Sequence, residues 1–168
     1  LGSASCVKCT PGKYAHGTGI CDDCESGKYS AEKATMCISC DRGEYSGPAA
    51  ASCTACSPGK YQDATAASSC DDCQQGKFSD SGAPLCSDCA LGEYQEATGK
   101  ATCKACAEGK FSSDTGASAC SDCGLNTYAA SVGNFKCTPC ADGSVAIKGQ
   151  GSCYQCTAGT HATSDLSR

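Results

Sequence analysis

The sequence predicts small disulfide-rich repeats that form an extended β-hairpin solenoid or rod, with little helix and no large hydrophobic core. Three observations lead to this prediction. Twenty of the 168 residues are cysteine, a proportion typical of disulfide scaffolds. Leu, Ile, Val and Phe together number only 14, too few to offset the conformational entropy of folding by burial alone. The cysteines recur as Cys-x-x-Cys pairs, with 15 to 17 residues from one pair to the next.

The repeat forms one continuous array of about ten units over residues 1–168. After each Cys-x-x-Cys pair come two variable residues, a glycine, one more residue and an aromatic, as in CSPGKY at residues 56–61. The last three copies depart from this pattern and read GLNTY, ADGSV and TAGTH. The first and last repeats are incomplete, so we expect further cysteine pairs before Leu1 and after Arg168.

The glycine of each repeat is predicted to form a tight turn with positive φ. The eighth copy carries Asn126 instead, and asparagine is the residue that best tolerates the left-handed region after glycine. The small polar stretch beyond the turn lacks a 3.6-residue apolar period, which favours two short strands over a helix. The turn positions are Gly12, Gly27, Gly43, Gly59, Gly76, Gly92, Gly109, Asn126, Gly143 and Gly159.

Two residues after the turn stands the only regular large apolar group of the repeat. We expect these rings to cover the neighbouring disulfide and to form a half-buried stripe, which is a packing role and not ligand stacking. Each unit is too small to bury a core alone, so it must stack on its neighbours. The packing aromatics are Tyr14, Tyr29, Tyr45, Tyr61, Phe78, Tyr94, Phe111 and Tyr128.

Three roles compete for the cysteine pairs. Zinc needs four converging thiolates, but the gaps of 11 to 13 residues are shorter than usual for such sites. A redox-active pair needs a thiol pKa lowered by a helix N-terminus or a cation, and one such motif suffices where this chain has ten. Structural disulfides are therefore favoured, with no metal and no cofactor.

Two disulfide connectivities fit the spacing. In one, pairs couple two by two, as Cys6–Cys21 with Cys9–Cys24. In the other, the second cysteine of each pair joins the first of the next; it is favoured because every loop carries the same phrase, and it leaves Cys6 and Cys156 to pair outside the given sequence. It gives Cys9–Cys21, Cys24–Cys37, Cys40–Cys53, Cys56–Cys70, Cys73–Cys86, Cys89–Cys103, Cys106–Cys120, Cys123–Cys137 and Cys140–Cys153.

Tandem Cys-x-x-Gly-x-Tyr/Phe followed by Cys-x-x-Cys resembles the ephrin-receptor-like cysteine-rich repeats, within the broader growth-factor-receptor and TNF-receptor-like group. The resemblance covers the whole chain and is best in copies one to seven. It implies one disulfide around the loop that follows each glycine, at Cys9–Cys21 and its equivalents. Long arrays of this kind are similar to those in extracellular proteins of protists and algae, including mastigoneme proteins of flagellar hairs. The motif specifies fold more than function.

The composition indicates an extracellular protein, secreted or on the cell surface, because disulfides persist in oxidising compartments. The net charge of −5 argues against nucleic acid as a partner, and no apolar run reaches the ~20 residues of a membrane span. The chain begins at Leu1 without a signal peptide, so we expect a segment of a longer protein. Serine and threonine number 35, which suits the exposed loops to O-linked glycans.

The first functional hypothesis is a structural shaft segment of an extracellular fibril or cell-surface filament, assembling with itself or with neighbouring domains of the same chain. One position of the repeat reads Lys, Lys, Glu, Lys, Lys, Glu, Lys in copies one to seven, a row suited to pairing with a neighbouring chain unless it is simply a solvated edge. The alternative is a receptor-like ectodomain or adhesion stalk that binds a protein ligand through the few off-pattern groups, Leu85, Leu91, Phe135 and Tyr154.

An enzyme is not expected. The two histidines, His16 and His161, are far apart in the sequence, and no nucleophile elbow or phosphate-binding loop is present. Calcium at the adjacent acids Asp22, Asp23, Asp71 and Asp72 is a weaker interpretation than solvation, because their spacing is not that of a calcium loop.

Overall fold

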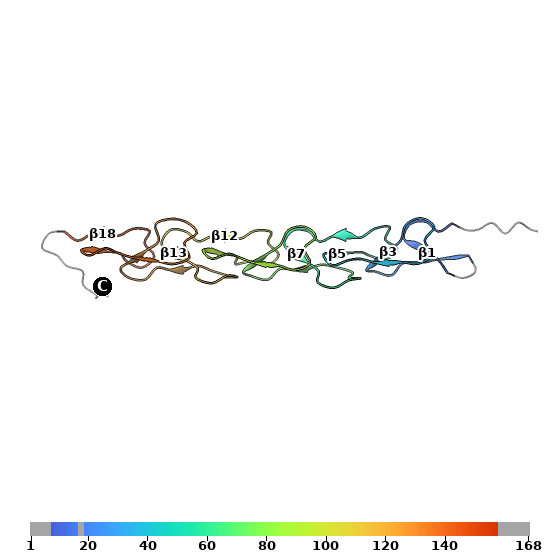
Figure 1. The fold of residues 1–168 in the computed structure, drawn as a ribbon, viewed down its shortest axis with the longest axis horizontal. Coiled ribbons are helices and arrows are strands. Elements are labelled where there is room, and N and C mark those ends of the chain that lie inside the picture. Colours follow the sequence, from blue (N-terminus) through green and yellow to red (C-terminus); the bar gives the residue numbers. More distant parts are fainter. Residues whose placement is uncertain (1–7, 17–18, 158–168) are drawn as a thin grey trace, which may run out of the picture. The chain divides into compact units, whose positions relative to one another are not determined.

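The computed structural model describes residues 8–16 and 19–157, and every regular element in these ranges is a short β-strand (Figure 1). None of the described residues belongs to a helix that is long and apolar enough to cross a membrane. The strands are β1 (Lys13–His16), β2 (Ile20–Asp23), β3 (Lys28–Tyr29), β4 (Ile38–Ser39), β5 (Glu44–Tyr45), β6 (Thr54–Ala55), β7 (Lys60–Tyr61), β8 (Asp71–Asp72), β9 (Lys77–Phe78), β10 (Ser87–Asp88), β11 (Glu93–Tyr94), β12 (Lys104–Ala105), β13 (Lys110–Phe111), β14 (Ser121–Asp122), β15 (Thr127–Tyr128), β16 (Thr138–Pro139), β17 (Ser144–Val145) and β18 (Tyr154–Gln155).

Consecutive strands pair in two-stranded sheets, of which the described residues form nine. The first strand of each hairpin follows the turn residue, and the second lies between the two cysteines of the next Cys-x-x-Cys pair, except that β2 begins before Cys21. In the antiparallel pair of β7 and β8, for example, Lys60 lies opposite Asp72 and Tyr61 opposite Asp71. These hairpins confirm the predicted fold class of small disulfide-rich repeats with little helix.

Nine disulfides close nine loops, with Cα–Cα distances from 5.5 to 5.8 Å that are ordinary for disulfides. Among the described residues Cys156 has no disulfide partner, and Cys6 lies outside them. We number the loops 1 to 9 in chain order by their disulfides: Cys9–Cys21, Cys24–Cys37, Cys40–Cys53, Cys56–Cys70, Cys73–Cys86, Cys89–Cys103, Cys106–Cys120, Cys123–Cys137 and Cys140–Cys153.

The chain divides into two compact units. The first takes in the residues up to 73 together with 78–86 and 99–101, and the second takes in 74–77, 87–98 and the residues from 102 onward. The same local geometry recurs in both units.

The turn before each hairpin has the geometry that its sequence predicts. In loop 1 the Lys13 N–H donates a hydrogen bond to the Thr10 carbonyl at 3.1 Å, and Gly12 between them has φ 86°. This is a turn that requires positive φ at its third residue. Asn126 takes the same conformation with φ 59°, as its place in the repeat predicts, whereas Gly159 lies outside the described residues.

Backbone hydrogen bonds join each loop to the next. Between loops 6 and 7, the Gly92 N–H donates to the Ser112 carbonyl and the Gln95 N–H to the Ala117 carbonyl, both at 3.0 Å. A third bond runs in the other direction, from the Gly116 N–H to the Cys89 carbonyl at 2.9 Å. The equivalent three bonds join successive loops from 1 to 5 and from 6 to 9. Because main-chain atoms make these contacts, the loops can vary in sequence without losing them.

Small residues fill the interior. The second cysteine of each pair from Cys9 to Cys123 has at most 2% of its surface exposed. From the second repeat onward the residue after each aromatic is also buried, and its polar atoms are satisfied locally: the Ser79 hydroxyl donates to the Lys60 carbonyl at 2.9 Å. No buried side-chain nitrogen or oxygen among the described residues lacks a hydrogen-bond partner. These buried residues are Ser30, Ser46, Gln62, Ser79, Gln95, Ser112, Ala129 and Ala146.

The turn glycines have a second requirement besides positive φ. A Cβ added to Gly92 would lie 2.0 Å from the carbonyl oxygen of Gly133, two loops further along the chain. All such contacts lie within one unit or the other, and each brings a carbonyl within 2.3 Å of the position that a Cβ would take. The glycines concerned are Gly12, Gly27, Gly43, Gly59, Gly76, Gly92 and Gly109.

We expect Gly92→Ala to destabilise the protein by about 3 kcal/mol or more, because it adds a backbone clash to left-handed strain. Gly143→Ala is the matched control: Gly143 has φ 79° in the same turn, but no described atom lies within 4 Å of its Cβ position. It should cost about 1–2 kcal/mol, the strain alone. Guanidinium unfolding of the non-reduced variants measures both, and equal losses would show that the contact between alternate loops is unimportant.

Candidate functional site

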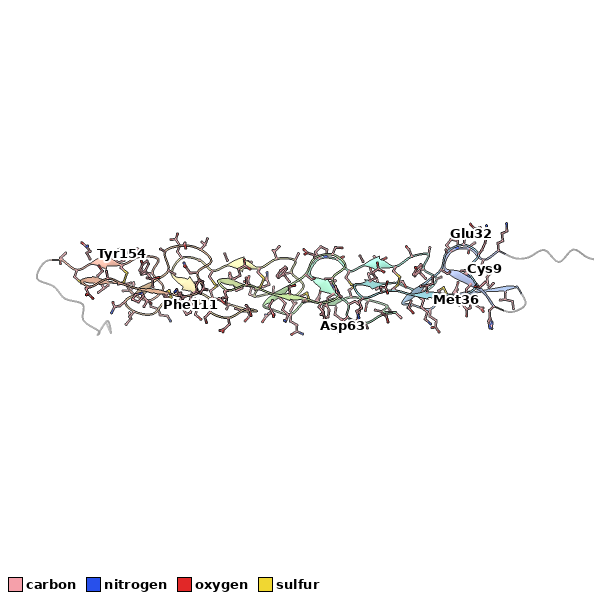
Figure 2. The ribbon with its side chains drawn as sticks, in the orientation of Figure 1. Cys9, Glu32, Met36, Asp63, Phe111 and Tyr154 are labelled. Carbon is pink, nitrogen blue, oxygen red and sulfur yellow. A yellow bond between two sulfur atoms is a disulfide. The ribbon has the colours of Figure 1, made fainter. Side chains whose placement is uncertain are left out.

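The aromatic rings lie at the surface of the repeat. All eight are half-buried, and from Tyr29 onward the residue that follows each ring is the buried one. The one contact between aromatic rings in the described residues joins Tyr14 and His16 of the same strand, with ring centroids 6.3 Å apart. Rings of successive repeats in this part of the chain do not stack on one another. Phe111, labelled in Figure 2, is one of these half-exposed rings. The sequence signal for the buried position was present, since it always holds Ser, Gln or Ala.

Ion pairs cross most of the hairpins that carry a lysine. The Lys60 ammonium lies 2.6 Å from the Asp72 carboxylate directly opposite it on β8. Equivalent pairs form in loops 1, 5 and 7, where the lysine also faces an aspartate: Lys13–Asp23, Lys77–Asp88 and Lys110–Asp122. These lysines of the row therefore form ion pairs within their own repeats. Exposed pairs of this kind contribute at most about 1 kcal/mol each.

The remaining positions of the row follow the same logic. Lys28 faces Ser39 and pairs instead with Glu25, 3.1 Å away. Where the row has glutamate, the residue across the hairpin is alanine: Ala55 lies opposite Glu44, and Ala105 lies opposite Glu93. The residue in the row and the residue opposite it on the second strand thus vary together, so that no glutamate of the row faces an acidic residue across the hairpin. Both positions can be read in the sequence, but only the pairing of the two strands shows that they face each other.

The Lys110 ammonium holds the pKa of Asp122 below its ordinary value, first through a hydrogen bond and then through its charge. Lys148, 3.7 Å from the same carboxylate, lowers this pKa further. In loop 6 the hydrogen bond to Glu96 raises the pKa of Lys104. Both pKa shifts are thus caused mainly by ion pairs at the surface.

Groups suited to catalysis or metal binding do not converge in the part of the chain that the structure describes. His16 lies 3.7 Å from Asp22, and His161 is outside the described residues. No cluster of three or more His, Cys, Asp or Glu side chains within residues 8–16 and 19–157 is arranged to hold a metal ion. Asp23 and Asp72, considered above for calcium, accept hydrogen bonds from lysines instead.

A surface groove of about 430 Å³ lies in the first unit. Loops 3, 4 and 5 each contribute to it, so it depends on the stacking of three successive loops. Pro84 and Leu85 supply its apolar lining, and the lining also includes charged side chains. The lining residues are Asp41, Arg42, Asp63, Thr65, Pro84 and Leu85.

Exposed apolar side chains gather in loops 8 and 9 of the second unit. Half of the ten large apolar residues that are exposed in the described part of the chain lie between residues 125 and 154. We call these five residues the apolar set: Leu125, Val132, Phe135, Ile147 and Tyr154. Sequence reasoning had singled out Phe135 and Tyr154; the other three were missed because their exposure depends on the hairpin geometry. The off-pattern residues Leu85 and Leu91 are exposed as well.

A family model described as tyrosine-protein kinase ephrin type A/B receptor-like matches residues 27–73, 76–119 and 109–148. These matches cover well over half of the chain and follow one another in tandem, as the resemblance in the sequence predicted. Such disulfide-rich repeats are an extracellular type of domain. No curated protein sequence matches the chain.

We expect Lys110→Ala to raise the pKa of Asp122 towards the ordinary aspartate value, because it removes the main cause of the shift. Lys148→Ala, which removes the more distant lysine, should raise it less. Since the folded-state pKa is lowered, the pair stabilises the fold above about pH 4 and loses this effect as the pH falls through the folded-state pKa. NMR titration of the Asp122 carboxyl carbon measures both variants; a larger shift for Lys148→Ala would contradict the assignment.

Proposed function

Because the chain belongs to the ephrin type A/B receptor-like family of cysteine-rich repeats, we propose that it is a structural shaft segment of an extracellular fibril or cell-surface filament. The observation that carries the proposal is the recurrence of one junction, in which the same backbone hydrogen bonds join successive loops from 1 to 5 and from 6 to 9. A unit that repeats its own junction can be added many times without a new kind of contact.

The energetics of one repeat support a shaft. Closing a loop of about 13 residues by a disulfide stabilises it by about 3 kcal/mol in the chain-entropy model. Three backbone hydrogen bonds per junction contribute about 1 kcal/mol each. Both contributions are local to a loop and its neighbours, so the stability of one part of the array does not depend on a distant core. This property suits a protein whose work is to span a distance.

Self-association, or contact with neighbouring domains of the same long chain, is the partner relationship that this function requires. The exposed serine and threonine side chains of the loops, such as Ser113 and Thr115, are suited to O-linked glycans. The ion pairs within the hairpins leave the repeat surface without a basic face, which supports neither nucleic acid nor an anionic membrane as partner.

A second candidate function is a receptor-like ectodomain or adhesion stalk that binds a protein ligand. The apolar set in loops 8 and 9 favours it, because exposed apolar groups that gather in one region often mark an interaction site.

Electron microscopy of the native, non-reduced protein tests the structural function. We expect regular filaments with an axial repeat, and we expect them to disappear when the disulfides are reduced, because the loops then lose their closure. Single dispersed molecules at every concentration would contradict the shaft and turn attention to the receptor-like candidate.

A further inference from the structure

Loops 8 and 9 have lost the features that define the surface of the other repeats. Where most lysine-bearing hairpins have a cross-strand ion pair, these two have Thr127 opposite Pro139 and Ser144 opposite Gln155. Val145 stands in the place of the aromatic. The additional apolar residues of these loops are not buried: Val132 is 65% exposed, and Tyr154, labelled in Figure 2, is 58% exposed. The departure therefore concerns the surface and not the packing.

The charge of this region differs from the rest of the chain. Residues 123–156 contain two lysines and one acid, a formal charge of +1, whereas the whole chain carries −5. One lysine contacts a member of the apolar set: the Lys136 ammonium lies 5.6 Å from the centroid of the Phe135 ring, a cation–π distance. Loops 8 and 9 thus present an exposed ring with a cation beside it.

The groove in the first unit has the complementary chemistry. Residues 40–89, which include it, contain seven acids and three basic residues, a formal charge of −4. Pro84 and Leu85 give it an apolar lining, to which Asp63, labelled in Figure 2, adds a carboxylate. Arg42 forms no ion pair among the described residues, and a guanidinium of this kind stacks well on an aromatic ring.

We propose that the Phe135 ring of one copy docks into the Arg42–Leu85 groove of a second copy, with Lys136 beside Asp63. The inference deepens the proposed function, on whose self-association it rests. The two surfaces are different, so the contact is heterologous: each copy offers one groove and one apolar set, and every added copy leaves one of each available. Contacts of this class build open filaments unless the rotation closes a ring.

The ring contact is tested by sedimentation velocity of the non-reduced full chain over a range of concentrations. Phe135→Ser should weaken association at least tenfold, because it removes the group that enters the groove. Met36→Ser is the matched control: Met36 is 66% exposed and belongs to neither the groove lining nor the apolar set, so its loss should change association less than twofold. Circular dichroism and a count of free thiols check that both variants keep the fold.

A charge exchange tests the partners within the contact. Asp63→Lys and Lys136→Asp should each weaken association at least fivefold, since each places like charges together. The double variant restores opposite charges in reversed positions and should return to within about threefold of the wild type. Restoration of this kind would not follow from a structural defect in either loop.

The outcomes separate the inference from the function on which it rests. Association that is unchanged by Phe135→Ser and by both charge reversals overturns the docking contact, while the proposed shaft stands on some other surface. A wild-type chain that stays monomeric at all concentrations overturns both. Loss of association in all variants without recovery in the double variant overturns the pairing of Lys136 with Asp63.

Discussion

Closure of the chain by a disulfide every 12 to 14 residues is the constraint on which the rest of this structure depends. A loop of that length, once closed, has lost most of the conformational freedom that a hydrophobic core would otherwise have to offset. Two-residue strands, which would not persist alone, then suffice to complete the hairpin. The buried residues of a repeat can consequently be a cysteine with one serine, glutamine or alanine, and no buried polar side chain is left unsatisfied in the described residues.

The loops recognise one another mainly through the backbone. The bonds between successive loops run between N–H and C=O groups, and the contact between alternate loops sets a carbonyl against a turn glycine. Side chains beyond the glycine, the cysteines and the small buried residue are therefore free to vary. This freedom explains how loops 8 and 9 could exchange ion pairs and a ring for exposed apolar groups while keeping the same junctions.

Much of this fold could be predicted from the sequence because its elements are local. The hairpins and the turn at Gly12 and its equivalents follow from residues within one repeat, and replacement of glycine by Asn126 revealed the sign of φ. The features that escaped prediction depend on register between segments. The pairing of Lys60 with Asp72 and the contact of Gly92 with Gly133 each require knowledge of which residues face each other across the hairpin or two loops away.

The contact between alternate loops also restricts how such an array can be rearranged. Recombination between repeats can insert or remove one whole repeat without a new junction, but the repeats are not interchangeable. The sequence of loop 8, moved to the position of loop 3, would place the Cβ of its asparagine where the Gly82 carbonyl approaches Gly43. A turn residue other than glycine is therefore excluded wherever a carbonyl two loops further along comes this close.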